Sequence, residues 1–262
     1  LFQTFLNAKR QVLTVEPTYT QIQPFIQIQG AQIRRLVPKD IFNPGTEEIS
    51  EHIQEGVDIV YLANPNNPTG NYFSYDQIRH LTQKHQTTLF IVDEAYIEFC
   101  GSQASAAKLI NDSVENLAVL RTFSKAFCLA SLRIGYLIAG SQITKQVAKI
   151  RNGKDVNSLG QIAAMAALDD LQHTEKHVEE VISTKNWFAG ECAKLNIRTT
   201  NTPANFILLH SPETQSTIQK LLNRRILVRD RSMLPGMNGM IRITIGTKEE
   251  MQRVLNVLKE EQ

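Results

Sequence analysis

The chain has 262 residues, 42% of them hydrophobic and 21% charged, which is close to the composition of globular proteins with packed cores. Its 28 basic and 26 acidic residues leave a formal net charge of +2, so overall charge gives no reason to expect nucleic acid or an anionic membrane as a partner. No run approaches the ~18 consecutive apolar residues of a membrane span, no signal peptide is visible, and three scattered cysteines form no disulfide framework. We therefore expect a cytoplasmic protein.

The chain opens at Leu1 without a methionine, inside what looks like the end of an amphipathic helix. This start suggests that the natural chain begins earlier. Short apolar runs then alternate with helical patterns through the first two thirds. Five of these runs predict strands: Gln11–Val15, Asp58–Ala63, Leu89–Val92, Leu117–Leu120 and Tyr136–Ala139.

Helical patterns separate these strands, and Tyr75–His85 is the clearest of them, with Ser74 as its expected N-cap. Nearly continuous apolar strands that alternate with helices are typical of a mostly parallel sheet covered on both faces. We therefore predict an α/β fold of three layers for residues 1–170.

The last third has a different pattern. Residues 157–195 show a long helical periodicity with few breakers, and strands are expected at Asn205–Leu209, Ile226–Arg229 and Met240–Ile245. Helices are expected at Thr217–Arg224 and Lys248–Lys259. This mixture predicts a second, smaller α+β domain over residues 171–262.

Polar motifs follow three of the predicted parallel strands: NPNNPTG (Asn64–Gly70), DEAY (Asp93–Tyr96) and TFSK (Thr122–Lys125). Open α/β sheets bind ligands outside the carboxyl ends of their strands, so these motifs mark the expected site. A lone lysine is usually a solvated charge, but Lys125 lies between hydroxyl residues and an apolar run, where an amine can attack an aldehyde to form a Schiff base.

The neighbouring residues allow a second interpretation besides ordinary turn and capping chemistry. Arg133 can clamp a phosphate, with hydroxyl hydrogen bonds from Thr122 and Ser124. Asp93 can pair with a protonated pyridine nitrogen, and Tyr96 can donate to a phenolic ring oxygen.

Two further residues complete this set. Asn67, in a turn stiffened by prolines, can bind the same ring oxygen, and Tyr19 in the motif PTY can stack on a planar ring. A core tyrosine and an ordinary turn remain alternatives for these two positions.

The ordered motifs PTY, NPNNPTG, DEAY, TFSKAF and LRIGY resemble the aspartate-aminotransferase fold family of pyridoxal-phosphate-dependent enzymes. With ILVRD and IRITIGTKEE, the chain is most similar to histidinol-phosphate aminotransferases, and this resemblance covers essentially its whole length. It implies a homodimeric aminotransferase with a small-molecule amino donor and a keto-acid acceptor, no metal, and the fold of an aspartate-aminotransferase-like large domain.

The resemblance also implies the site. Lys125 would be the catalytic lysine that binds pyridoxal 5′-phosphate, and Arg229 and Arg242 would bind the anionic group of the substrate. The cofactor would contact the residues singled out above: Tyr19, Asn67, Asp93, Tyr96, Thr122, Ser124, Lys125 and Arg133.

The chain departs from the family pattern at Cys128 and Ser131, where glycines are usual, and at Ile22, where an aromatic residue is common. The family's glycine-containing turn that binds cofactor phosphate would precede Leu1. We expect histidinol phosphate and 2-oxoglutarate as substrates. The alternatives are a threonine-phosphate decarboxylase, another aminotransferase of similar sequence, or a non-catalytic cofactor-binding sensor domain.

Overall fold

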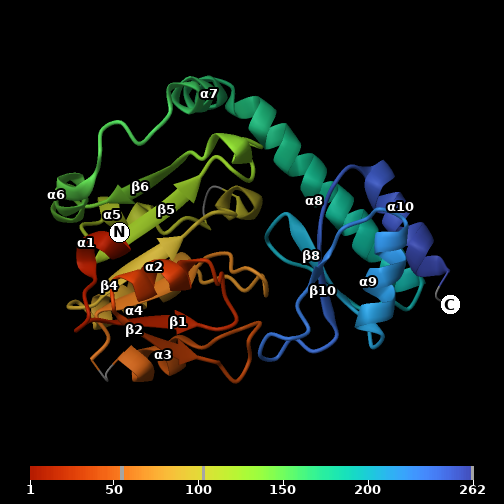
Figure 1. Ribbon diagram of the computed structural model, residues 1–262, viewed down its shortest axis with the longest axis horizontal. Helices are drawn as coiled ribbons and strands as arrows, with labels where there is room; N and C mark the ends of the chain where they lie inside the picture. The colour runs from red at the N-terminus through yellow and green to blue at the C-terminus, as the bar shows by residue number, and fades with distance from the viewer. Residues whose placement is uncertain (54–55, 102–103, 261–262) are drawn as a thin grey trace.

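The computed structural model describes residues 1–53, 56–101 and 104–260, and its larger sheet has the strand order β2-β1-β3-β4-β5-β6 (Figure 1). The first five strands in that order are parallel, and β6 pairs with β5 antiparallel. The strands are β1 (Gln11–Val15), β2 (Gln32–Leu36), β3 (Ile59–Ala63), β4 (Leu89–Asp93), β5 (Leu117–Thr122) and β6 (Gly135–Ala139).

Alternate residues of each central strand face opposite layers, because side chains in a strand point to alternate sides of the sheet. In β3, Val60 and Leu62 pack in a core with Ile49 and Ile78, whereas Tyr61 packs with Ile26 on the other face. All five residues of β3 are buried. The predicted three-layer α/β architecture is therefore confirmed.

Helices cover both faces of this sheet and connect its strands. Ser74 caps α4 as expected, because its hydroxyl accepts from Gln77 N at 3.3 Å and the Gln77 side chain accepts from Ser74 N at 2.8 Å. The helical elements of this part are α1 (Phe2–Phe5), α2 (Ile22–Ile28), α3 (Thr46–Ile53), α4 (Tyr75–Lys84), η1 (Ile97–Cys100), α5 (Lys108–Asn111), η3 (Ala130–Leu132) and α6 (Ser141–Ile150).

A second, antiparallel sheet with the order β7-β8-β10-β9 forms the C-terminal part of the protein. Its strands are β7 (Thr199–Thr200), β8 (Phe206–His210), β9 (Arg229–Asp230) and β10 (Met240–Thr244). Apolar residues of α8 (Leu171–Lys194), α9 (Thr214–Asn223) and α10 (Lys248–Lys259) pack with the buried side chains of β8 and β10. The observed mixture matches the predicted α+β composition, and a domain boundary at residue 171 stays a prediction.

Several predicted boundaries were wrong. The expected strand Ile226–Arg229 shrinks to β9, because Arg225 takes a left-handed φ of 59° and Ile226 N donates to Leu221 O, which closes α9. The helical stretch 157–195 is two helices, α7 (Ser158–Asp169) and α8, separated at Asp170, whose carboxylate caps His173 N. Strand β2 and helix α3 were not predicted.

Helix α8 runs from the side of the first sheet to the second (Figure 1). Its C-terminal half shares a core with Tyr96 and Phe99, which follow β4, and with Ala126, which follows β5. The loops at the carboxyl edge of the large sheet are thus packed directly on the small one. Within the described residues, no helix is long and apolar enough to cross a membrane.

Glu98 in η1 is a partly buried acid whose Oε2 has no hydrogen-bond partner among the described residues. Burial raises the pKa of Glu98 to about 7, with a smaller contribution from the Glu94 carboxylate and an opposing one from Arg121. Between the ordinary pKa of 4.5 and about 7, the folded chain holds a proton that the unfolded chain has lost.

We expect the free energy of unfolding to fall as pH rises through this window, and Glu98→Gln to reduce that fall by about 3 kcal/mol. Urea denaturation of the parent and the variant at about pH 5 and pH 8 measures how the free energy of unfolding changes with pH. Glu179→Gln, at an exposed position of α8, is the control. Equal pH dependence in the Glu98 variant and the parent would contradict the prediction.

Candidate functional site

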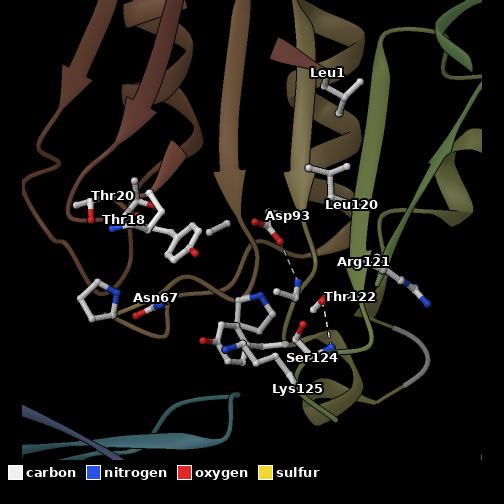
Figure 2. Close-up of a pocket in the computed structure, with 18 of the residues that line it drawn as sticks. Leu1, Thr18, Thr20, Asn67, Asp93, Leu120, Arg121, Thr122, Ser124 and Lys125 are labelled. Atoms are coloured by element: carbon white, nitrogen blue, oxygen red, sulfur yellow. Dashed lines mark hydrogen bonds between the residues drawn. The ribbon is translucent and has the colours of Figure 1, made fainter. Parts of the chain in front are cut away.

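A cavity of about 920 Å³ lies between the carboxyl edge of the large sheet and the strands β9 and β10 of the small one. All ten residues predicted from the sequence line it: Tyr19, Asn67, Asp93, Tyr96, Thr122, Ser124, Lys125, Arg133, Arg229 and Arg242. Figure 2 shows that Asn67, Asp93, Thr122, Ser124 and Lys125 gather where the strand arrows end. This cavity is large enough for a cofactor together with a small substrate.

The parallel topology explains why residues so distant in sequence meet. Tyr19 follows β1, Asn67 follows β3, Asp93 ends β4, and Lys125 follows β5. These strands are neighbours in the sheet and run in one direction, so their carboxyl ends share one edge. Arg229 and Arg242 reach the same space from the second sheet.

Asp93 is held in place by two hydrogen bonds. The Tyr61 hydroxyl donates to Oδ2 at 2.7 Å, and the backbone N–H of Ala95 donates to Oδ1 at 3.1 Å. Burial raises the pKa of Asp93 above its usual value, while these two bonds and the nearby Lys125 amine oppose the rise. The remaining lone pairs can accept a proton-bearing ring nitrogen.

Tyr61 was missed by the sequence analysis. It is 1% exposed and sits in the apolar run IVYLA, which looks like ordinary core. The available signal was the hydroxyl itself, because a buried tyrosine oxygen usually needs a hydrogen-bond partner. Asp93 is that partner.

Lys125 is partly buried beside the aromatic ring of Tyr96, whose centroid is 5.4 Å from Nζ. Burial lowers the pKa of the Lys125 amine, the positive charges of Arg242 and Arg133 lower it further, and Asp93 acts in the opposite direction. An amine in this setting loses its proton more readily than a surface lysine, which suits it to act as nucleophile and base.

The NPNNPTG turn uses its three asparagines differently. Asn64 donates to Phe73 O at 2.9 Å and Asn66 donates to Pro17 O at 2.8 Å, so both buried amides stabilise the turn. Asn67 lines the cavity, and its Oδ1 accepts from Arg242 Nη1 at 2.5 Å. That bond orients the Asn67 amide so that its NH₂ group remains available for a ligand.

Gly70 closes the turn against the second sheet. Its φ is +76°, and a Cβ there would lie 2.4 Å from Thr202 Cβ. A side chain would therefore force the two segments apart, so the glycine permits the close approach of the turn to residues before β8.

The predicted phosphate-binding group lies after β5. The Thr122 hydroxyl donates to Ile134 O at 3.2 Å and accepts from Ser124 N at 3.1 Å, so it braces the loop. Since a hydroxyl has one hydrogen to donate, anion binding in this arrangement would fall to Ser124 and Arg133. Arg133 is exposed, with its Nη1 donating to Ala130 O at 2.8 Å.

Cys128 adopts a left-handed φ of 57°, the region that glycine occupies without strain. This conformation accounts for the glycine that the family pattern has at this position. The Cys128 side chain is exposed, with Sγ 3.3 Å from His177 Nε2 on α8. Ser131 lies exposed in η3, and its φ is not left-handed.

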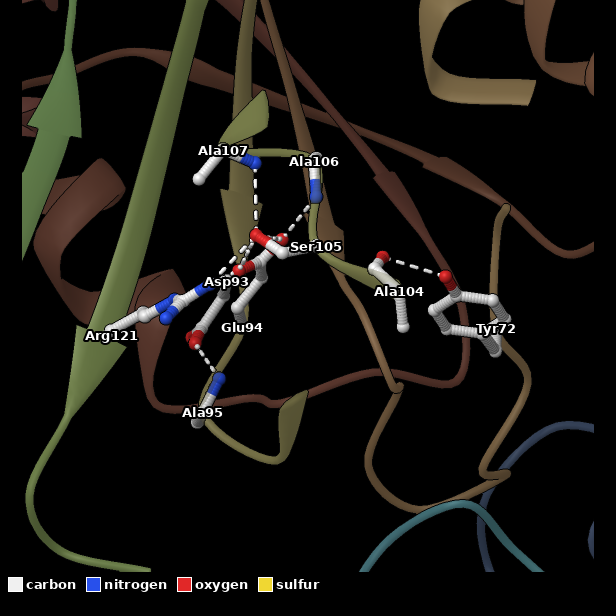
Figure 3. Close-up of polar contacts among 9 residues, drawn as sticks. All are labelled: Tyr72, Asp93, Glu94, Ala95, Ala104, Ser105, Ala106, Ala107 and Arg121. Atoms are coloured by element: carbon white, nitrogen blue, oxygen red, sulfur yellow. Dashed lines mark hydrogen bonds and ion pairs between the residues drawn. The ribbon is translucent and has the colours of Figure 1, made fainter. Parts of the chain in front are cut away.

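Glu94 is not among the residues that line the cavity, and its polar contacts anchor the loops beside it (Figure 3). Its fully buried carboxylate accepts from Arg121 Nε at 3.0 Å, from the Ser105 hydroxyl at 2.8 Å and from Ala106 N at 2.6 Å. Burial raises the pKa of Glu94, and these donors oppose the rise. The ion pair ties the end of β4 to β5.

Arg231 also lines the cavity, although it was not among the residues predicted from the sequence. It is partly buried, whereas Arg229 is exposed. The available signal was the alternation R-D-R at residues 229–231, which places both arginines on one side of an extended segment.

Comparison with known proteins gives a consistent result. The family model for aminotransferase class I and II matches residues 1–258. The dihydroxyacetone phosphate transaminase of Campylobacter jejuni is 34% identical over 99% of this chain and 71% of its own length. The histidinol-phosphate aminotransferase 1 of Carboxydothermus hydrogenoformans is 34% identical over 99% of this chain and 73% of its own length.

Solved structures show the same similarity. The histidinol-phosphate aminotransferase of Sinorhizobium meliloti, in complex with pyridoxal-5′-phosphate, superposes with a TM-score of 0.89 and 25% identity. The match covers 99% of this chain and 72% of that one.

Tyr61→Phe is expected to lower the free energy of unfolding by about 1–2 kcal/mol, because it removes a hydrogen bond to a buried acid. The loss should be larger at about pH 7.5 than at about pH 4.5, since the Tyr61 bond favours the ionised form of Asp93. Urea denaturation at both pH values measures this difference.

Tyr72→Phe is the matched control, because the Tyr72 hydroxyl donates to a backbone carbonyl, Ala104 O, at 2.6 Å and not to a carboxylate (Figure 3). The decrease in the free energy of unfolding caused by Tyr72→Phe should not depend on pH in the same way. A Tyr61 variant that behaves like the Tyr72 variant would refute the link to Asp93.

Proposed function

Because the chain belongs to the aminotransferase class I and II family, we propose that it exchanges an amino group between histidinol phosphate and 2-oxoglutarate. The observation that carries the proposal is that a partly buried amine, Lys125, and a braced carboxylate, Asp93, share a cavity with a wall of arginines. The chain is an enzyme, and its cofactor is pyridoxal 5′-phosphate.

The donor set fits this cofactor. Pyridoxal phosphate, when bound, supplies an aldehyde that captures amines and a protonated ring that accepts electrons from the bond being broken. Lys125 is the amine that would hold it, and Asp93 the acid that would keep its ring nitrogen protonated. Ser124 and Arg133 would hold its phosphate, with Thr122 bracing their loop.

Three residues would position the ring. Tyr19 would stack on it, while the Asn67 amide and the Tyr96 hydroxyl would donate to its phenolic oxygen. The Asn67–Arg242 bond supports the Asn67 assignment, because it presents the NH₂ group of the amide.

Lys125 would also act as the base. As a free amine, its Nζ would remove the proton from the amine-bearing carbon of the substrate. The lowered pKa of Lys125 supports this role, because a neutral amine is needed to accept that proton. Asp93, held by Tyr61 and Ala95, keeps its carboxylate in position throughout.

Arg229 and Arg242 would bind the anionic group of each substrate in turn: the phosphate of histidinol phosphate and the distal carboxylate of 2-oxoglutarate. A guanidinium fits both groups in fork geometry.

A second candidate acceptor or product is dihydroxyacetone phosphate, the substrate named for the C. jejuni relative, which is as similar to this chain as the C. hydrogenoformans enzyme. Both candidates carry a phosphomonoester. Assays with histidinol phosphate, dihydroxyacetone phosphate and threonine phosphate, with carbon dioxide measured for the last, separate these functions.

We further propose a homodimer formed through α7. This helix exposes large apolar side chains at helical spacing, Leu159, Ile162, Met165 and Leu168, between 49% and 74% exposed. Contiguous apolar surface of this kind marks interaction sites on proteins, and the family resemblance indicates a second copy as the partner.

We also propose that the enzyme works in the cytoplasm without nucleic acid or membrane partners. The net charge of +2 and the three unpaired cysteines, Cys100, Cys128 and Cys192, support this.

Lys125→Ala is expected to abolish turnover, because it removes both the cofactor's covalent partner and the base. Borohydride reduction followed by peptide mapping should label Lys125 with pyridoxal phosphate in the parent and leave the variant unlabelled. Lys84→Ala, at a lysine that pairs with Glu47 and does not line the cavity, is the control. A fully active Lys125 variant would end the proposal.

Ile162→Glu on α7 is expected to convert a dimer to a monomer, because a buried unpaired charge would destabilise the interface. Sedimentation velocity measures the change. Leu227→Glu introduces the same charge at a side chain that is 85% exposed and distant in sequence from α7, and it should leave the dimer intact. If the Ile162→Glu variant remains a dimer, the interface is not formed by α7.

A further inference from the structure

Three arginines lie together on one wall of the cavity: Arg229, Arg231 and Arg242. Arg242 in β10 is directly opposite Arg229 in the antiparallel register with β9. Arg231 follows two residues after Arg229, and its backbone N–H donates to Met240 O at 2.9 Å, which extends the pairing. The three side chains therefore share one face of two adjacent strands.

Like charges directly opposite each other destabilise a sheet, so this cluster needs an anion. No carboxylate forms an ion pair with any of the three within the part of the chain that the structure describes. The nearest acid in sequence, Asp230, is occupied by Ser232 and by the Gln215 amide at 2.7 Å.

Two of the three guanidiniums are partly buried, and each has one buried nitrogen without a hydrogen-bond partner. The Nε atoms of Arg231 and Arg242 are inaccessible and make no hydrogen bond among the described residues. Burial lowers the pKa of Arg231, and the charges of Arg242 and Arg229 lower it further. Arg242 has Nη1 engaged with Asn67 and its guanidinium over the Phe206 ring, 5.3 Å from the centroid.

A carboxylate carries one negative charge, which a single guanidinium fork can satisfy, whereas a phosphomonoester carries nearly two charges on three oxygens. We infer that Arg231 is a specificity-determining residue, which makes this wall select a phosphomonoester over a carboxylate. This inference rests on the proposed function, since it names the substrate group that the aminotransferase site prefers. Arg231 supplies the second fork that Arg242, already bonded to Asn67, does not.

The test uses the enzyme loaded with pyridoxal phosphate, so that the cofactor's own phosphate site is filled. Calorimetry measures the affinity of two amine-free probes, propyl phosphate and butyrate. Arg231→Gln is expected to lower the affinity for propyl phosphate by about 10- to 100-fold, which corresponds to the loss of one charge-assisted contact. Its affinity for butyrate should fall by less than about threefold. Arg231→Lys keeps the charge without the fork, so its affinity for propyl phosphate should lie between those of the parent and Arg231→Gln.

Kinetics give an independent readout. In Arg231→Gln, kcat/KM for histidinol phosphate should fall about 10- to 100-fold, mostly through KM, while kcat/KM for histidinol, which lacks the phosphate, should change little. Arg253→Gln, at an exposed arginine of α10, is the matched control and should resemble the parent in both assays. Thermal unfolding checks that each variant is folded, and Arg231→Lys replaces Arg231→Gln if the latter is not.

The outcomes distinguish this inference from the proposed function. If the parent turns over histidinol phosphate but Arg231→Gln keeps the parent's preference for propyl phosphate over butyrate, the role of Arg231 is wrong and the proposed function stands. A parent that binds propyl phosphate through Arg231 but does not turn over histidinol phosphate supports the inference and removes the proposed donor. A parent that binds propyl phosphate no better than butyrate overturns the inference.

Discussion

The placement of one amine and one carboxylate at a shared sheet edge is the constraint on which the rest of this structure depends. Lys125 follows β5 and Asp93 ends the adjacent β4, so parallel pairing brings the two loops together. Each charge alters the other's titration in the expected sense, since Asp93 opposes the lowering of the Lys125 pKa and Lys125 opposes the raising of the Asp93 pKa. A flexible arrangement of the same groups would lose this coupling to water.

Around that pair the cavity is strongly cationic. Among the described residues that line it, Asp93 is the one acid, and the cations are Lys125, Arg133, Arg229, Arg231 and Arg242, while Arg121 is paired with Glu94. Such an excess favours anionic ligands at both ends of the cavity, in spite of a net charge of only +2 for the chain. The Glu94–Arg121 ion pair and the Tyr61–Asp93 hydrogen bond stabilise the opposite side of the cavity, at the edge of the large sheet.

The two sheets also share the site, so neither forms it alone. Arg242 from β10 bonds Asn67 from the loop after β3, and the Tyr96 ring meets Phe206 of β8 edge to face with centroids 5.5 Å apart. Residues of both parts contribute to one core. A change in how the sheets pack would therefore move the anion-binding wall relative to the amine.

The sequence by itself determined five of the six strands of the large sheet, because these strands are continuous apolar runs. Most of the ten candidate residues lie in or near the polar motifs that follow those strands, whereas Arg229 and Arg242 were candidates because of the family resemblance. Only the tertiary structure decided the supporting partners. The sequence indicated only a core role for Tyr61, and its hydrogen bond to Asp93, 32 residues away, is a tertiary contact. Arg231 became a candidate only because strand pairing places it near Arg242. Local patterns report which way a side chain faces, whereas pairing between distant segments depends on packing that no short stretch of sequence encodes.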